Sequence, residues 1–163
     1  MKIVHWADLE DEIEKKLKSL MVYFPIMYQR LYDTKSAGSY LPAQPCDFLV
    51  WAPKTPGIFL EAKYSGIAES LRSVFSNAVS DQQLASARLA SRAGQKYWLL
   101  FYGARSAVFE LWDGKYCSDR RAMGKPLEIT QRVVCPTLGE ALETHVLGLD
   151  QEKLRRLAAK EKR

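Results

Sequence analysis

The sequence has few cysteines, and their arrangement argues against two common kinds of small domain. Three are present among 163 residues, at Cys46, Cys117 and Cys135, and none forms a Cys-x-x-Cys pair. An odd number of widely spaced cysteines argues against a disulfide framework and against a zinc site, and it fits a reducing cytosol. His5 and His145 share no metal-ligand spacing, so we expect each to be a surface or capping residue.

Long apolar segments are also absent. No run approaches the roughly 18 residues that a membrane span needs. The first residues, MKIVHWADLEDEIEKK, become acidic where a signal peptide would have its apolar core. We therefore expect a cytoplasmic protein with no membrane partner. Without repeats, low-complexity tracts or linkers, residues 1–163 are predicted to form a single domain, with residues 150–163 as a basic C-terminal helix or arm.

What the chain does have is an excess of positive charge. It contains 24 Lys and Arg against 19 Asp and Glu, a formal net charge of +5. Its 47% hydrophobic and 26% charged residues are typical of a soluble globular domain, which excludes a disordered chain. A basic domain attracts polyanions, so nucleic acid is a natural partner, although the charge can also serve solubility alone.

The hydrophobic pattern predicts an α/β fold with a mixed central sheet flanked by helices. Asp8 is expected to cap a first helix, and Pro and Gly in PKTPG predict a hairpin between two short strands. Trp51, Trp98 and Trp112 fall in predicted strands and are expected in the core. In order, the predicted elements are a helix over 9–21, a strand within 22–33, a loop over 34–45, strands over 47–53 and 57–65, a helix over 80–94, and strands over 96–103 and 106–114.

The segment PCDFLVWAPKTPGIFLEAKYS carries the chemistry. Because side chains alternate along a strand, Glu61 and Lys63 project on the side of Phe59, opposite Leu60. Buried charges are costly unless they pair or bind a metal ion. The hairpin can bring Asp47 beside Glu61, and a divalent cation relieves the repulsion between two close carboxylates.

Such a group suits phosphodiester hydrolysis. A hard cation polarises the phosphoryl oxygen and activates a water, and a neighbouring lysine offsets the developing charge. Glu-x-Lys alone is a weak signal, since Glu14-Lys15-Lys16 repeats it in the predicted first helix. The alternative for Glu61 and Lys63 is an ordinary surface ion pair.

The stretch from Pro45 to Lys63 resembles the PD-(D/E)XK nuclease signature. Together, LEDEIEKKL, CDFLVWAPKTPGIFLEAKYS and SDQQLASARLASRAGQKYWLLFYG resemble RecU-type Holliday junction resolvases, and more loosely the archaeal resolvases, from Leu9 to about Gly103. This resemblance implies a restriction-endonuclease-like α-β-β-β-α-β core. The sequence departs from RecU proteins at Cys46, where threonine is common, and in a short segment before Asp47 that leaves little room for their stalk.

The resemblance also implies a metal site. Asp47 and Glu61 would bind Mg²⁺, for which Mn²⁺ can substitute. In the family an acidic residue of the first helix completes the cluster, and Glu10 matches it best, with Glu14 as a weaker candidate.

Further roles follow from the same resemblance. Lys63 would orient the attacking water, and Gln83 would support it, because Gln82-Gln83 stands where the family has a His-Gln pair. The loop after the first predicted strand resembles the mobile loop that reaches the scissile strand, while the cations beside it can contact phosphates or be simple surface charges. The DNA-binding candidates are Arg30, Thr34, Lys35 and Ser36.

The function predicted from the sequence is a metal-dependent Holliday junction resolvase, in a bacterial or phage-infected cell, that nicks four-way DNA junctions symmetrically. Opposed nicks imply a two-fold homodimer. One alternative is a PD-(D/E)XK nuclease with another DNA substrate, and another is a non-catalytic DNA-binding protein on the same fold. Trp6 can pack in the core, on a partner subunit or on a base, with the core preferred.

Overall fold

A computed structural model of the chain describes residues 3–31, 44–53 and 55–161. Its strands are β1 (Met27–Arg30), β2 (Phe48–Trp51), β3 (Ile58–Ser65), β4 (Lys96–Gly103), β5 (Val108–Asp113) and β6 (Val133–Cys135). They form one sheet whose spatial order follows the chain. β3 and β4 run parallel, whereas the other four neighbouring pairs are antiparallel. The long connection between β3 and β4 carries two helices, as a parallel crossover requires.

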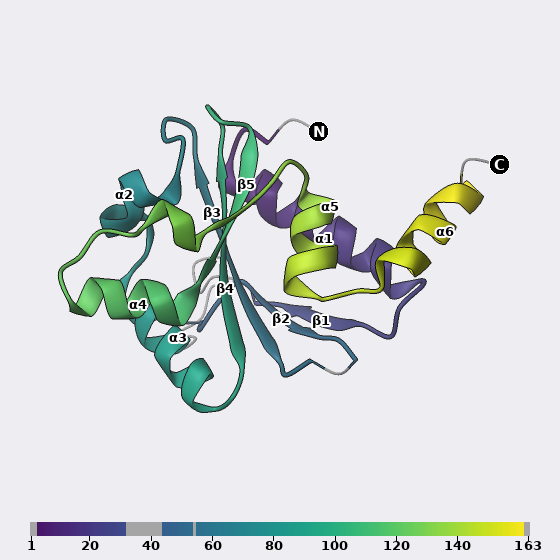
Figure 1. Cartoon of the computed structure of the whole chain (residues 1–163), viewed down its shortest axis with the longest axis horizontal. Coiled ribbons are helices and arrows are strands. Elements are labelled where there is room, and N and C mark those ends of the chain that lie inside the picture. The colour runs from purple at the N-terminus through teal and green to yellow at the C-terminus, as the bar shows by residue number, and fades with distance from the viewer. Residues whose placement is uncertain (1–2, 32–43, 54, 162–163) are drawn as a thin grey trace, which may run out of the picture.

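Helices cover both faces of this sheet (Figure 1). On one face lie α1 (Trp6–Met21), α5 (Leu138–Glu140) and the π-helical turn η2 (Ala141–Val146), with α6 (Gln151–Glu161) beyond them. On the other lie α2 (Leu71–Ala78), α3 (Asp81–Arg92) and α4 (Gly114–Ala122), and a 3-10 turn η1 (Ile129–Gln131) leads into β6. The predicted mixed α/β class is confirmed, and the order from α1 to β4 contains the predicted α-β-β-β-α-β core.

The core is divided by the sheet into two apolar layers. Leu9, Ile13, Leu17 and Leu20 recur along one side of α1 and are buried against the sheet, as their helical spacing predicted. On the opposite face, α2, α3 and α4 close a second layer. Its largest fully buried members are Leu71, Leu84, Leu99, Phe101 and Trp112.

The β2–β3 hairpin determines which side chains meet. Phe48 pairs with Leu60, and continuing this antiparallel register by one residue places Asp47 opposite Glu61. Along β3, Leu60 packs in the layer under α1, whereas Phe59 packs against the layer under α3. The alternation therefore directs Glu61 and Lys63 toward α3, as the sequence predicted.

The start of α1 differs from its prediction. The helix begins at Trp6 with His5 as the N-cap residue, so the expected cap at Asp8 is wrong by one turn. Asp8 instead accepts hydrogen bonds from the backbone N of Val4 and of His5, both at 2.9 Å, which satisfies donors that the helix start leaves free. The expectation that His5 is a capping residue is confirmed.

Two tryptophans also differ from prediction. Trp112 is fully buried, as expected, but Trp51 is 41% exposed, because it pairs with the exposed Met27 on the edge strand β1. Trp6 is 60% exposed, so the preferred core position is wrong. Several elements were not predicted: α2 lies in the polar stretch after β3, α4 follows β5, where a turn was expected, and η1, β6, α5 and η2 lie between α4 and α6.

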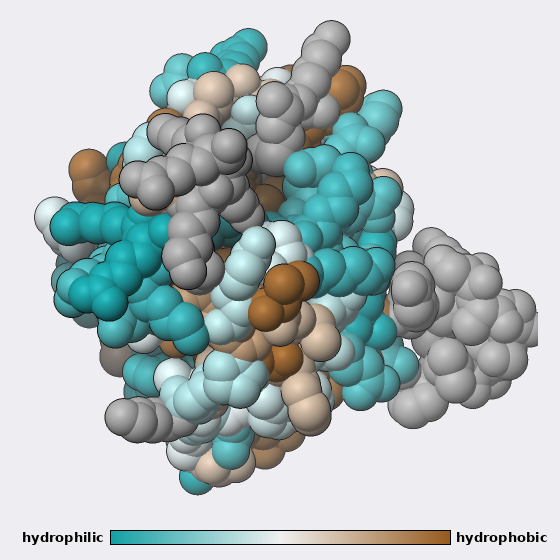
Figure 2. Space-filling view, turned by 90° about the vertical axis from the view of Figure 1, so that its right-hand side faces the viewer, coloured by the Kyte–Doolittle hydropathy of each residue, from teal (hydrophilic) through white to brown (hydrophobic). Residues whose placement is uncertain are grey.

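The basic C-terminal segment forms a helix, one of its two predicted forms. Lys153 of α6 donates from its Nζ to the carbonyl of Tyr23 at 3.0 Å and lies 4.6 Å from the centre of the Phe24 ring. Figure 2 shows the side of the molecule that lies on the right in Figure 1, where α6 is. This surface is largely hydrophilic, with a small group of hydrophobic side chains near the centre. Among the described residues, no helix is long and apolar enough to cross a membrane.

Candidate active site

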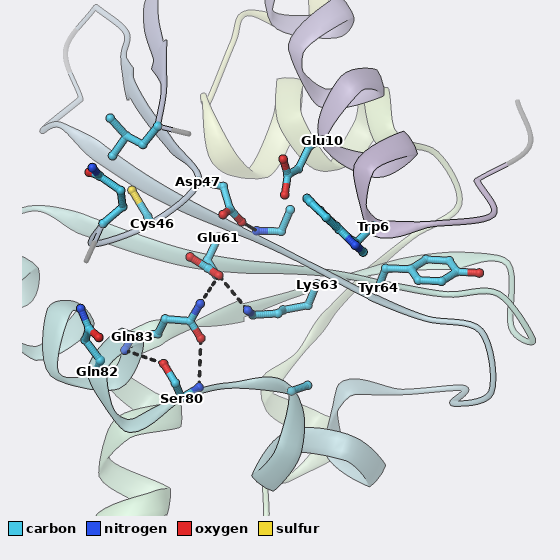
Figure 3. A pocket seen from close by; sticks show the side chains of 14 residues that line it. Trp6, Glu10, Cys46, Asp47, Glu61, Lys63, Tyr64, Ser80, Gln82 and Gln83 are labelled. Atoms are coloured by element: carbon cyan, nitrogen blue, oxygen red, sulfur yellow. Dashed lines mark hydrogen bonds and ion pairs between the residues drawn. The ribbon is translucent and has the colours of Figure 1, made fainter. Parts of the chain in front are cut away.

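A pocket of about 470 Å³ lies between the first turns of α1, the β2–β3 hairpin and the start of α3. It is lined by the residues that the sequence favoured for catalysis or metal binding: Glu10, Asp47, Glu61, Lys63 and Gln83. Figure 3 shows these five side chains directed into a common space. They come from three separate parts of the chain, so the fold brings together what the sequence keeps apart.

Asp47 is anchored by the backbone on both sides. Its carbonyl accepts from the backbone N of Leu31 at 2.8 Å, and its carboxylate Oδ2 accepts from the backbone N of Ala62 at 2.7 Å. Burial, together with the charge of Glu61, raises the pKa of Asp47 to about 7. Near neutral pH the carboxylate therefore exchanges its proton readily for another positive charge.

Glu61 is 2% exposed and holds two donors on one oxygen. The Nζ of Lys63 lies 2.7 Å from Oε1, and the amide nitrogen of Gln83 donates to the same atom. Burial raises the pKa of Glu61 above its usual range, although the Lys63 ammonium opposes this shift. The alternative of an ordinary surface ion pair is wrong, because both side chains are largely buried.

The helix cap of α3 sets the orientation of Gln83. Ser80 is the N-cap residue, and its hydroxyl accepts from the backbone N of Gln83 at 3.2 Å. In return the Oε1 of Gln83 accepts from the backbone N of Ser80 at 2.9 Å, which completes a capping box. Since the amide oxygen is used in the cap, the amide NH₂ is left to face Glu61. Gln82 is exposed beside it.

Glu10 reaches the pocket from α1. Burial, and then the charge of Asp47, raises its pKa above the usual range, and its Oε2 accepts from Arg30 at 2.8 Å. Among the described residues, Glu10, Asp47 and Glu61 do not form a group whose oxygens all lie within 4.8 Å of one another. A role for Glu10 as third ligand thus remains a prediction. Glu14 does not line the pocket; it pairs with Lys18 and Arg30, and its pKa is lowered to about 2.

Arg30 is engaged within the protein. Its guanidinium forms ion pairs with Glu10, Asp11 and Glu14, at 2.7 to 3.0 Å. Three carboxylates compensate its charge and hold α1 against β1, so its predicted phosphate contact remains a prediction that this geometry does not favour. The other DNA-binding candidates, Thr34, Lys35 and Ser36, lie outside the described residues.

Several pocket residues were not assigned to the site from the sequence, and two of them bear on its chemistry. Trp6 stands at the rim, one helical turn before Glu10, and this i, i+4 spacing was the signal that could have found it. Cys46 also lines the pocket, where its Sγ donates to the carbonyl of Phe48 at 3.1 Å. Burial, followed by the charges of Glu61 and Asp47, raises the pKa of the thiol, so Cys46 is a poor nucleophile here.

The residues present fit a hard divalent cation. Asp47 and Glu61 supply carboxylate oxygens in a largely buried setting where their charges repel, and such oxygens are the preferred ligands of Mg²⁺ and Mn²⁺. A cation between them would remove the repulsion that raises the pKa of Asp47. These two residues would hold the ion, and Glu10 lines the same pocket.

Comparisons with known proteins give a limited result. No protein-family model matches the sequence, and no curated protein matches it significantly. One similar solved structure is that of Hjc, a Holliday junction resolvase from the archaeal hyperthermophile Archaeoglobus fulgidus. The two share 14% identity and a TM-score of 0.41 over 68% of this chain and 74% of that chain. At this level of similarity, function must be inferred from the pocket itself.

Proposed function

We propose that this protein is a metal-dependent endonuclease of the PD-(D/E)XK type. One observation carries the proposal: the β2–β3 hairpin sets Asp47 opposite Glu61 within the sheet, with Lys63 held on the Glu61 carboxylate. Buried like charges are costly and persist where they serve a function. A pair of acids that can hold a divalent cation, with a lysine beside them to offset developing negative charge, suits metal-assisted phosphodiester hydrolysis.

Each residue has a distinct part in this reaction. A bound divalent cation supplies Lewis-acid activation of the phosphodiester and of the attacking water. Asp47 and Glu61 bind the cation and fix its position. Lys63 places a positive charge where negative charge develops on the phosphorus oxygens. Gln83 holds the Glu61 carboxylate in one orientation through its capped amide, and therefore acts as a positioning residue.

The proposed substrate is DNA, and specifically a branched or four-way junction. The net charge of +5 favours a polyanion. The junction preference follows from the sequence resemblance to resolvases between Leu9 and Gly103. Two nicks of opposite polarity at one junction need two active sites related by a two-fold axis, so the active form is proposed to be a homodimer.

The test is cleavage of a labelled four-way junction, beside linear duplex and single strands, in Mg²⁺ and in EDTA. We expect paired nicks at the junction that require Mg²⁺ or Mn²⁺. Asp47→Asn is expected to abolish cleavage while a gel shift shows unchanged junction binding, because the substitution removes a metal ligand and keeps the shape of the pocket.

Other outcomes separate the alternatives. Metal-dependent cutting of linear DNA would retain the active site and reject the junction substrate. DNA binding with no cutting in either metal would favour a non-catalytic DNA-binding protein. Full activity of the Asp47→Asn variant would overturn the assignment of the pocket.

A further inference from the structure

A second group of metal-binding side chains lies outside the pocket, beside the edge strand β6. Cys135 ends β6, Glu140 ends α5, and His145 belongs to the π-helical turn η2. One ligand atom from each residue, a sulfur, a carboxylate oxygen and an imidazole nitrogen, lies within 4.8 Å of the other two. Three segments thus bring a thiol, a carboxylate and an imidazole into one small volume.

The π-helical turn explains why His145 and Glu140 share a side. In an α-helix, side chains five residues apart point about 140° away from each other. A π turn is closed by bonds between residues i and i+5, so positions five apart return to nearly the same face. The backbone N of Leu147 donates to the carbonyl of Leu142 at 2.9 Å, which is a bond of this kind. Such turns occur frequently at functional sites.

These side chains are not committed to other partners. Across residues 3–31, 44–53 and 55–161, none of the three forms a side-chain hydrogen bond or an ion pair. Cys135 is fully buried and free of any disulfide, whereas Glu140 is exposed. The group therefore combines a protected thiol with a carboxylate that an incoming ion can reach from solvent.

We propose that Cys135, Glu140 and His145 form a binding site for a thiophilic divalent transition metal, with Zn²⁺ as the expected ion. Thiolate and imidazole ligands select Zn²⁺, whereas the carboxylates of the pocket select a hard cation such as Mg²⁺. Zinc bonds of about 2.0 to 2.3 Å in tetrahedral geometry separate ligand atoms by roughly 3.3 to 3.8 Å. A group already within 4.8 Å needs side-chain shifts of only about 1 Å to close.

The ion has a definite structural consequence. β6 is a three-residue edge strand, paired on one side with β5. Zinc bound to Cys135 and to the helical residues Glu140 and His145 ties this strand to the α5–η2 segment. Three protein ligands leave a fourth position for water or an external ligand. The chain would then hold two metal sites of different chemistry, one in the pocket and one at the edge of the sheet.

The test uses the full-length chain, stripped of metal with EDTA and then titrated with Co²⁺ as a spectroscopic substitute for Zn²⁺. We expect one equivalent to produce a thiolate-to-cobalt charge-transfer band, together with the intense visible bands of tetrahedral cobalt. Zn²⁺ should displace both and raise the thermal midpoint by several degrees, whereas Mg²⁺ should do neither. The bands should be lost in Cys135→Ala and in His145→Asn.

Matched controls locate the thiolate. Cys46→Ala in the pocket and Cys117→Ala in α4 should retain the bands, and so should Asp47→Asn, which keeps this result independent of the proposed nuclease. Because Cys135 lies in the core, His145→Asn serves as the decisive variant if Cys135→Ala fails to fold. Absence of the bands in the wild type, or bands that depend on Cys46 instead, would overturn the proposal.

Discussion

Two buried glutamates project toward the same layer of helices from strands on either side of β4. Glu61 of β3 is 2% exposed and Glu110 of β5 is 0% exposed. Glu110 is surrounded by donors: its Oε2 accepts from the Ser70 hydroxyl, the backbone N of Leu71 and the Trp112 indole, each at 3.0 Å. Its second oxygen pairs with Arg132.

Glu61 has a different environment. Lys63 and Gln83 share one of its oxygens, and the carboxylates of Asp47 and Glu10 stand nearby. The carboxylate of Glu110, on β5, lies at the start of α2. There the free N–H groups and the helix dipole favour a negative charge. The two glutamates are therefore equally buried but lie in opposite electrostatic environments. Glu110, with its donors complete, has the environment of a structural carboxylate, whereas the proposed function assigns Glu61, which faces other carboxylates, to a cation.

The largest expected effect is on catalysis at Glu61. Glu61→Gln should reduce the rate of metal-dependent cleavage by about a thousandfold or more, which corresponds to about 4 kcal/mol of lost transition-state stabilisation. The amide keeps the size of the side chain but lacks the charge that binds the cation. Single-turnover cleavage and metal titration by calorimetry measure the effect. Urea unfolding should show no loss of stability, and a clear loss would mean that Glu61 is structural like Glu110.

The matched substitution at Glu110 should act on stability instead. Glu110→Gln is expected to lower the free energy of unfolding by about 3 kcal/mol, because it removes the counterion of Arg132 from a buried site. The midpoint of urea unfolding gives the value. Replacing both partners, with Glu110→Gln and Arg132→Met, should recover part of the loss. If Glu110→Gln retains full stability but loses cleavage, the contrast between the two glutamates fails.

Local pattern explains why one of these glutamates could be identified from the sequence. Asp47, Glu61 and Lys63 follow from strand alternation and a short hairpin, both of which are local rules that the structure confirms. Glu110 has the same alternation in its strand, but its role depends on Arg132 and on the start of α2, which are distant in sequence. No local rule identifies such partners.

The other differences between the sequence predictions and the structure also arise from contacts between residues that are distant in sequence. The exposure of Trp51 depends on its place beside an edge strand, and the grouping of Cys135, Glu140 and His145 depends on a π turn, which sequence periodicity does not reveal. The prediction against a zinc site rested on the number and spacing of the cysteines along the sequence. Ligands gathered by tertiary structure lie beyond that rule.

A smaller effect, on the free energy of unfolding, is expected when a change of pH titrates the carboxyl group of Asp47. Its pKa is about 7 in the folded chain and 3.8 in an unfolded reference, so the folded state binds this proton more tightly. Metal-free protein should therefore lose stability as pH rises from about 4 to about 7. Asp47→Asn should abolish this part of the pH dependence. Urea unfolding in EDTA at a series of pH values measures both, and Mg²⁺ at pH 8 should restore stability to the wild type alone.

The smallest effect, on the rate of cleavage, is expected when Gln83 no longer orients the Glu61 carboxylate. Gln83→Ala should reduce cleavage by about 10- to 100-fold, the range seen when a residue that orients a metal ligand is removed. Gln82→Ala is the matched comparison, because Gln82 also lines the pocket but is exposed and forms no hydrogen bond with Glu61, so its effect should be much smaller. Gln83→Ala also weakens the cap of α3, so activity must be compared with stability. The variant Gln83→Glu separates the two roles. It keeps an oxygen that can cap α3 but places a negative charge against Glu61. If it restores stability but not cleavage, the contact with Glu61 is the one that matters, and recovery of both would reduce Gln83 to a helix cap.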